Sequence, residues 1–209
     1  WNGEDFQDIP VLVKAQGKCT TDHVSPAGQW LRFRGHLDNL SDNMFLGAVN
    51  AFTEDIGTGQ NQLSGEQVQP IPQIAREYKA QGLRWVAIGD HNYGEGSSRE
   101  HAAMSPRMLG AAAIITRSFA RLAETNLKKQ GVLPFTFEDS DDYDRIKVDD
   151  RVSIVGLDRL APGQPVQCVL KHADGSEDTV NLRHSLNEPQ IEWFKAGGAM
   201  NYMKLQEGA

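Results

Sequence analysis

Apolar segments alternate with an amphipathic one through the middle of the chain. Residues 83–89 and 111–116 are nearly continuous apolar runs, which is typical of buried strands, and residues 132–137 form a third such run. Residues 119–131 carry apolar side chains on one side, two lysines near their end and Gly131 as a stop signal, so they predict an amphipathic helix. This alternation of strand and helix favours an α/β core in which some strands pair in parallel.

The C-terminal part of the chain follows a different pattern. Three stretches alternate apolar and polar residues and predict strands, namely 151–157, 165–172 and 178–184. The last two are joined by residues 173–176, which predict a hairpin turn. Asn187 then predicts the cap of a final helix, with Pro189 near its first position. We therefore expect an α/β fold with a mixed sheet flanked by helices, followed by a C-terminal hairpin and helix.

Length and glycine and proline content set the expected domain organisation. A chain of 209 residues fits one domain with a proper core, so residues 1–209 are expected to form a single domain. Residues 53–73 combine glycines and prolines with polar side chains and predict a flexible surface loop. Because the chain begins with Trp1 rather than Met, we expect it to be a piece of a longer polypeptide.

Charge and cysteine content exclude several classes of function. The 21 basic and 28 acidic residues give a formal net charge of −7, the wrong sign for a general nucleic-acid binder, whose phosphate contacts need a basic face. No apolar run approaches the roughly 18 residues of a membrane span, so we expect no membrane partner. Cys19 and Cys168 have neither a CxxC spacing nor a third cysteine and cannot supply the thiolates of an iron–sulfur cluster. We expect both to be buried thiols in a reducing compartment.

Residues 94–101 hold the densest chemical signal, and two interpretations of them stay open. In the first, Ser97 and Glu100 form a capping box that satisfies free N–H groups at a helix start. In the second, the glycines let a ligand approach the backbone, and Arg99 in the first helical turn binds a carboxylate or phosphate. A cation there opposes the helix dipole unless an anion lies nearby, which favours the second interpretation. A serine hydroxyl in such a site is a candidate base, because N–H donors would stabilise its alkoxide.

Five segments together resemble the C-terminal domain of the aconitase family. They are distributed along nearly the whole chain and are KCTTDHVSPAG (18–28), FRGHLDN (33–39), GDHNYGEGSSREHAA (89–103), FARLAETNLKKQG (119–131) and IEWFKAGGAMN (191–201). The resemblance implies a swivelling β/β/α domain that closes over a [4Fe–4S] cluster held by three cysteines of preceding domains. It also implies a hydro-lyase of the tricarboxylic acid cycle that interconverts citrate and isocitrate through cis-aconitate. Since this chain lacks those cysteines, we expect it to bind no cluster by itself and to be inactive alone.

The resemblance also implies roles for individual residues, matched by motif position. Ser97 would be the base that removes and returns the carbon-bound proton, and Asp22 would assist that acid–base step. Ser98, Arg99 and Arg34 would bind substrate carboxylates, which agrees with the need of a net-acidic protein to gather arginine donors around a tricarboxylate. No metal ligand is expected in this chain, and no role is assigned to four histidines, His23, His36, His91 and His101.

Three alternatives stay open beside this interpretation. The small subunit of an isopropylmalate isomerase shares a GSSREHA-like motif, although residues 18–28 and 33–39 favour aconitase. Homoaconitase acts on a substrate of different chain length, and this domain alone barely separates the two. Some aconitase relatives bind RNA after losing their cluster, but the acidic charge argues against that here. The thiols and the lack of a visible signal peptide predict the mitochondrial matrix for a eukaryotic source and the cytoplasm for a bacterial one.

Overall fold

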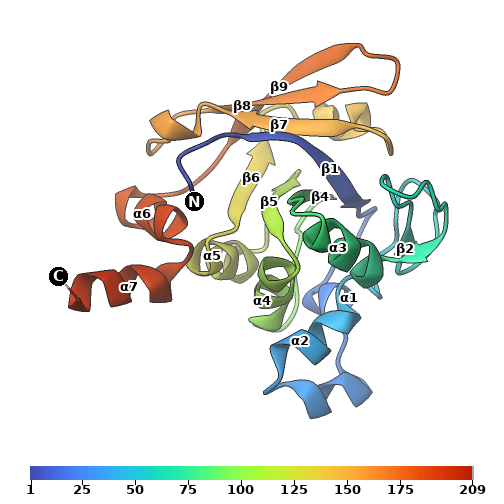
Figure 1. The fold of residues 1–209 in the computed structure, drawn as a ribbon, viewed down its shortest axis with the longest axis horizontal. Coiled ribbons are helices and arrows are strands. Elements are labelled where there is room, and N and C mark those ends of the chain that lie inside the picture. The colour runs from blue at the N-terminus through green and yellow to red at the C-terminus, as the bar shows by residue number, and fades with distance from the viewer. Residues whose placement is uncertain (209) are drawn as a thin grey trace.

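A closed barrel of seven strands organises the computed structural model, which describes residues 1–208 (Figure 1). In their order around the barrel the strands are β1 (Phe6–Lys14), β4 (Trp85–Gly89), β5 (Ala111–Thr116), β6 (Leu133–Phe137), β9 (Glu177–Arg183), β8 (Val166–Lys171) and β7 (Arg151–Val155). β1, β4, β5 and β6 pair in parallel. The pairs from β6 through β9, β8 and β7 back to β1 are antiparallel. The expected mixed α/β sheet is confirmed. The sequence did not predict that this sheet closes into a barrel.

Helices gather beside the parallel half of the barrel (Figure 1). They are α3 (Ile71–Ala80), α4 (His101–Met108), α5 (Arg121–Gln130), α6 (Glu188–Ala196) and α7 (Ala199–Glu207). The long connection between β1 and β4 holds α1 (Thr21–Val24), α2 (Leu37–Leu40), β2 (Thr58–Gly59) and β3 (Gln69–Pro70). Within the described part of the chain, no helix combines the length and apolarity needed to cross a membrane.

The parallel strands bury both of their faces, which explains their continuous apolar runs. In β4, Val86 and Ile88 belong to a core inside the barrel to which all seven strands contribute. Trp85 and Ala87, on the opposite face of β4, belong to a second core beneath the helices. The antiparallel strand β7 instead alternates buried and partly exposed residues. The two halves of the barrel therefore differ in sequence pattern because only one of them is covered on the outside.

Local signals at the helix ends behave as the sequence predicts. α5 ends at Gly131, which adopts the left-handed conformation (φ +74°), so the predicted helix and its stop are confirmed. α6 begins after Asn187, whose side chain accepts a hydrogen bond from Gln190 N–H. The Gln190 side chain in turn accepts from Asn187 N–H and completes a capping box.

Two segments depart from the apolar pattern. The sequence does not predict β1, because Asp8 and Pro10 interrupt its apolar pattern. In the structure Asp8 has a positive φ (+51°), and the pairing register of the strand shifts twice. Within residues 53–73 the structure places the small sheet β2–β3 and the start of α3 at Ile71. The flexibility of residues 53–73 stays a prediction. The organisation of residues 1–209 as a single domain also stays a prediction.

The loop that follows β4 passes closely over α5 at Gly94. Gly94 N–H donates to Cys19 O (2.7 Å), and Gly94 has a φ of +80°. A Cβ atom built at Gly94 would overlap the Cβ atom of Ala123 on α5. A side chain at this position is therefore excluded both by backbone conformation and by space.

A buried histidine ties the β8–β9 hairpin to the end of the barrel. His172 Nδ1 lies 2.7 Å from Asp150 Oδ1, and Nε2 lies 2.7 Å from Asp178 Oδ2. Because ionised carboxylates only accept, both ring nitrogens donate and the imidazole carries a positive charge. The hydrogen bonds that His172 donates to Asp178 and Asp150 raise its pKa above the ordinary value. The His172 and Arg145 hydrogen bonds lower the pKa of Asp178.

Replacing Gly94 by alanine should lower the free energy of unfolding by about 2–4 kcal/mol, through left-handed strain and overpacking against α5. Gly163→Ala is the matched control, since Gly163 has a similar φ (+73°) but no atom lies within 4 Å of the place that its new methyl group would take. It should cost only about 1–2 kcal/mol. Urea unfolding of both variants measures the difference. Equal losses would contradict the close packing of the loop on α5.

The raised pKa of His172 predicts a stability that depends on pH. Its contribution is fully present below pH 6.5, the ordinary value for the unfolded chain, and is lost as the pH rises through the higher folded pKa. Urea unfolding between about pH 6 and 9 should show this loss in the wild type and a smaller one in Asp178→Asn. Asp174→Asn, in the same hairpin but bonded to Ser176, is the control and should keep most of the wild-type slope. An unchanged slope in Asp178→Asn would contradict the assignment.

Candidate active site

The candidate site lies where two connections meet at the carboxyl ends of the parallel strands β1 and β4. The segment containing α1 follows β1, and the loop that begins at Asp90 follows β4. Backbone hydrogen bonds join them, from Thr21 N–H to Glu95 O (3.0 Å) and from Gly94 N–H to Cys19 O (2.7 Å). In α/β folds, the carboxyl ends of adjacent parallel strands are the usual place for a ligand.

An ion pair connects the two segments. Arg99 Nη1 lies 2.5 Å from Asp22 Oδ1, and the same nitrogen donates to Ser25 O. The Arg99 side chain is 19% exposed and that of Asp22 is 62% exposed, so the pair itself adds at most about 1 kcal/mol to stability. Its effect is to orient the guanidinium. Because both contacts use Nη1, the Nε and Nη2 edge stays available to a carboxylate.

Of the two interpretations of residues 94–101, the capping box formed by Ser97 and Glu100 is wrong. α4 begins only at His101, and Glu100 occupies the N-cap position with helical backbone angles and no side-chain cap bond. Arg99 N–H bonds to Ser97 O (2.8 Å) instead, in an irregular turn. Gly96, with a φ of +108°, and the tertiary contacts of Arg99 hold this turn out of the helix.

The expected position of Arg99 in the first turn of a helix is also wrong, because α4 begins only at His101. Arg99 directly precedes the N-cap Glu100, and its guanidinium is paired with Asp22, so the helix dipole gives no separate argument for an external anion. The case for an anion site depends instead on the free guanidinium edge of Arg99 beside the exposed Ser97 and Ser98. Pro106 lies inside α4, three residues before its C-cap.

Arg34 approaches the site through its backbone. It follows the 3₁₀ turn Gly28–Phe33, and its carbonyl oxygen lies 3.2 Å from His101 Nε2 at the start of α4. Its guanidinium is exposed, and no ion pair joins it to Asp22 within residues 1–208. The structure thus brings together Asp22, Ser97, Ser98 and Arg99, and it leaves the Arg34 side chain free at the edge of this group.

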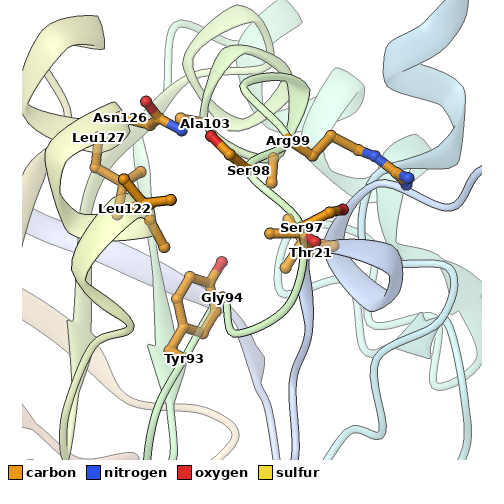
Figure 2. A pocket seen from close by; sticks show the side chains of 13 residues that line it. Thr21, Tyr93, Gly94, Ser97, Ser98, Arg99, Ala103, Leu122, Asn126 and Leu127 are labelled. Carbon is orange, nitrogen blue, oxygen red and sulfur yellow. The ribbon is translucent and has the colours of Figure 1, made fainter.

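Residues 94–99, which include Ser97 and Ser98, form what we call the serine turn. A small hollow lies beneath it, between the turn and α5 (Figure 2). Its volume is about 10 Å³, roughly the room for one water molecule, so a tricarboxylate would have to lie over the exposed hydroxyls rather than inside it. Tyr93 and Asn126 line this hollow together with Ser97, Ser98 and Arg99. Neither Tyr93 nor Asn126 was predicted from the sequence, because no spacing pattern distinguishes them within their segments.

The described residues offer no cluster-binding group of cysteines. Cys19 lies in the core beneath the helices, and Cys168 lies in the core inside the barrel. Both are free, and burial raises the pKa of each thiol to about 12, so neither is a thiolate at neutral pH. No set of three or more His, Cys, Asp or Glu side chains within residues 1–208 is placed to hold a metal ion. An iron–sulfur cluster therefore does not fit the residues of this chain alone.

Comparison with known proteins finds relatives over the whole chain. A "probable aconitate hydratase, mitochondrial" of Caenorhabditis elegans is 58% identical over 204 residues, which are 98% of this chain and 26% of that protein. The mitochondrial aconitate hydratase of Gracilaria gracilis is 56% identical over 100% of this chain and 27% of its own length. That of Saccharomyces cerevisiae is 53% identical over 99% of this chain and 26% of its own length. The chain spans about a quarter of the length of these relatives.

A solved structure shares the fold. The 3-isopropylmalate dehydratase of Methanocaldococcus jannaschii superposes with a TM-score of 0.63 at 21% identity, over 98% of this chain and 96% of that one. At this identity the likeness concerns the fold only. The family description "Aconitase C-terminal domain" matches residues 9–140, which are more than half of the 209 residues and include Asp22, Arg34 and the serine turn. This chain therefore belongs to the family of aconitase C-terminal domains.

Proposed function

We propose that this chain is the mobile C-terminal domain of an aconitate hydratase, a hydro-lyase that interconverts citrate and isocitrate through cis-aconitate. The observation that carries the proposal is the Asp22–Arg99 ion pair beside the exposed hydroxyls of Ser97 and Ser98, at the carboxyl ends of two parallel strands. The names of the relatives, which are aconitate hydratases that this chain matches over a quarter of their length, support it. Their mitochondrial labels support the mitochondrial matrix for a eukaryotic source.

In this proposal the residues of the serine turn bind and deprotonate the substrate. Arg99 presents its free guanidinium edge to one carboxylate, and Ser98 donates a hydrogen bond to the same group. Arg34, exposed at the edge of the site, binds a further carboxylate. Ser97, deprotonated to its alkoxide, takes the proton from the carbon next to a carboxylate. The electron pair of that C–H bond forms the C=C bond of cis-aconitate as the hydroxyl group leaves the neighbouring carbon with the electron pair of its C–O bond. Asp22 fixes the orientation of Arg99 and supports this proton transfer.

The remaining half of the site belongs to other domains in this proposal. The [4Fe–4S] cluster, held by cysteines outside this chain, would act as a Lewis acid when bound. The volume of the hollow, about 10 Å³, supports this division because the hollow beside Ser97, Ser98 and Arg99 is too small to enclose a tricarboxylate. Closure of this domain would then supply the opposite wall and exclude water, and opening would release product.

The isolated chain should not convert citrate to isocitrate, whereas the full-length protein should. The assay follows cis-aconitate absorbance with citrate as substrate, for the lone chain and for the full-length protein with its cluster. Turnover by the lone chain would contradict the division of the site. Preference of the full-length protein for homocitrate or isopropylmalate over citrate would contradict the substrate and favour homoaconitase or isopropylmalate isomerase.

In the full-length protein, Ser97→Ala should lower kcat by about 10²–10⁴-fold with little change in KM, since it removes the proposed base. Arg99→Lys should mainly raise KM, by roughly 10- to 100-fold, because lysine cannot form the two parallel hydrogen bonds of the guanidinium. Steady-state kinetics with citrate separate the two effects. Arg159→Lys, at a site whose side chain is 84% exposed and remote from the serine turn, is the control. Near-normal turnover in Ser97→Ala would exclude the hydroxyl as the base.

A further inference from the structure

The hydroxyl of Tyr93 is buried without a partner. Tyr93 is only 2% exposed, and its Oη atom forms no hydrogen bond with any of residues 1–208. An unsatisfied buried hydroxyl costs about 1–3 kcal/mol, so its presence calls for a physical reason. Burial also raises the pKa of Tyr93 well above its ordinary value, which keeps the hydroxyl protonated as a donor.

The backbone and ring of Tyr93 are fixed, so its hydroxyl cannot turn away. Tyr93 N–H donates to Ser118 O (3.0 Å), and Tyr93 O accepts from Ala120 N–H (2.9 Å). The ring packs edge-on against Phe119, with the ring centroids 5.9 Å apart. Figure 2 shows the hydroxyl directed into the hollow, towards Ser98 and Asn126. The hydroxyl therefore points at one defined place beneath the serine turn.

The hollow has the size and the lining that a single water molecule requires. A bound water needs roughly 10–15 Å³ and two to four polar partners, and the hollow offers about 10 Å³. The residues with polar side chains that line it are Tyr93, Asn126, Ser97, Ser98, Arg99 and Thr21. The rest of the wall is apolar and is formed by Val24, Ala102, Ala103, Leu122, Ala123 and Leu127.

The serine turn is fixed firmly at its ends and weakly in its middle. Gly94 N–H bonds to Cys19 O at one end, and the Arg99 side chain bonds to Asp22 at the other. Glu95 O also accepts from Thr21 N–H (3.0 Å), so the weakly held part is residues 96–98, where the hydrogen bond from Arg99 N–H to Ser97 O is local to the turn. A partner in the hollow would give the middle of the turn a contact with α5.

We infer that the hollow binds one water molecule, held by the Tyr93 hydroxyl and the Asn126 amide, which in turn hydrogen-bonds the Ser98 hydroxyl. Tyr93 and Asn126 are thus positioning residues that act on the serine turn through this water. The inference rests on the proposed function only for its kinetic consequence, because Ser98 is proposed to bind a substrate carboxylate. The water and its effect on the turn stand independently of the reaction.

The test uses the full-length protein, its Tyr93→Phe variant and Asn126→Leu as a second variant that keeps the side-chain volume. A high-resolution crystal structure of the wild type should show one water within hydrogen-bond distance of Tyr93 Oη and the Asn126 side chain. Hydrogen exchange of the amides of residues 97–99 should be about tenfold faster in either variant, as expected for the loss of one hydrogen bond. KM for citrate should rise about tenfold, with a smaller fall in kcat.

Tyr78→Phe is the matched control. It also removes a buried tyrosine hydroxyl, one that accepts from Gln62 N–H (2.9 Å) at the edge of α3, and it should leave the exchange of residues 97–99 unchanged. A dry hollow in the wild-type structure would overturn the inference, as would unchanged exchange in both Tyr93→Phe and Asn126→Leu. If the full-length protein does not act on citrate, the proposed function fails, but the water and the exchange rates still decide the inference.

Discussion

The need of parallel strands to bury both faces determines most of this structure. β4 and β5 are apolar on each side, so one face fills the barrel and the other must be covered by helices. The connections that lead from these strands to their helices leave at the carboxyl ends. There the loop after β4 meets the segment after β1, and the Asp22–Arg99 pair forms between them. The candidate site is thus a consequence of how the core is covered.

Elements set by local signals were predictable, and those set by distant pairing were not. β5 coincides with the apolar run 111–116, and the C-terminal end of α5 and the cap of α6 follow from Gly131 and Asn187. β1 has no such local signature, because Asp8 and Pro10 break its alternation and the strand is held only by partners far along the chain. Barrel closure could not be predicted for the same reason, since no short segment of sequence encodes it.

The site shows the same limit on a smaller scale. The segment 94–101 was identified from its residues, but its internal geometry was not, because the Asp22 and Ser25 contacts of Arg99 prevail over the local capping signal of Ser97 and Glu100. A capping box contributes about 1 kcal/mol, which a tertiary ion pair and a glycine turn can offset. Residues that matter through a shared hollow, such as Tyr93, have no spacing pattern at all and become visible only once α5 is placed.

The position of β1 in the barrel has a consequence for the growing chain on the ribosome. β1 is made first, yet one of its edges pairs with β7, where Ile9 faces Val152. Until β7 emerges, that edge presents unpaired N–H and C=O groups, the kind of surface to which other chains add. At about 5–20 residues per second, the intervening stretch takes on the order of ten seconds to synthesise. During that time Asp8 and Pro10, which make the strand irregular, also make its open edge a poor template for aggregation.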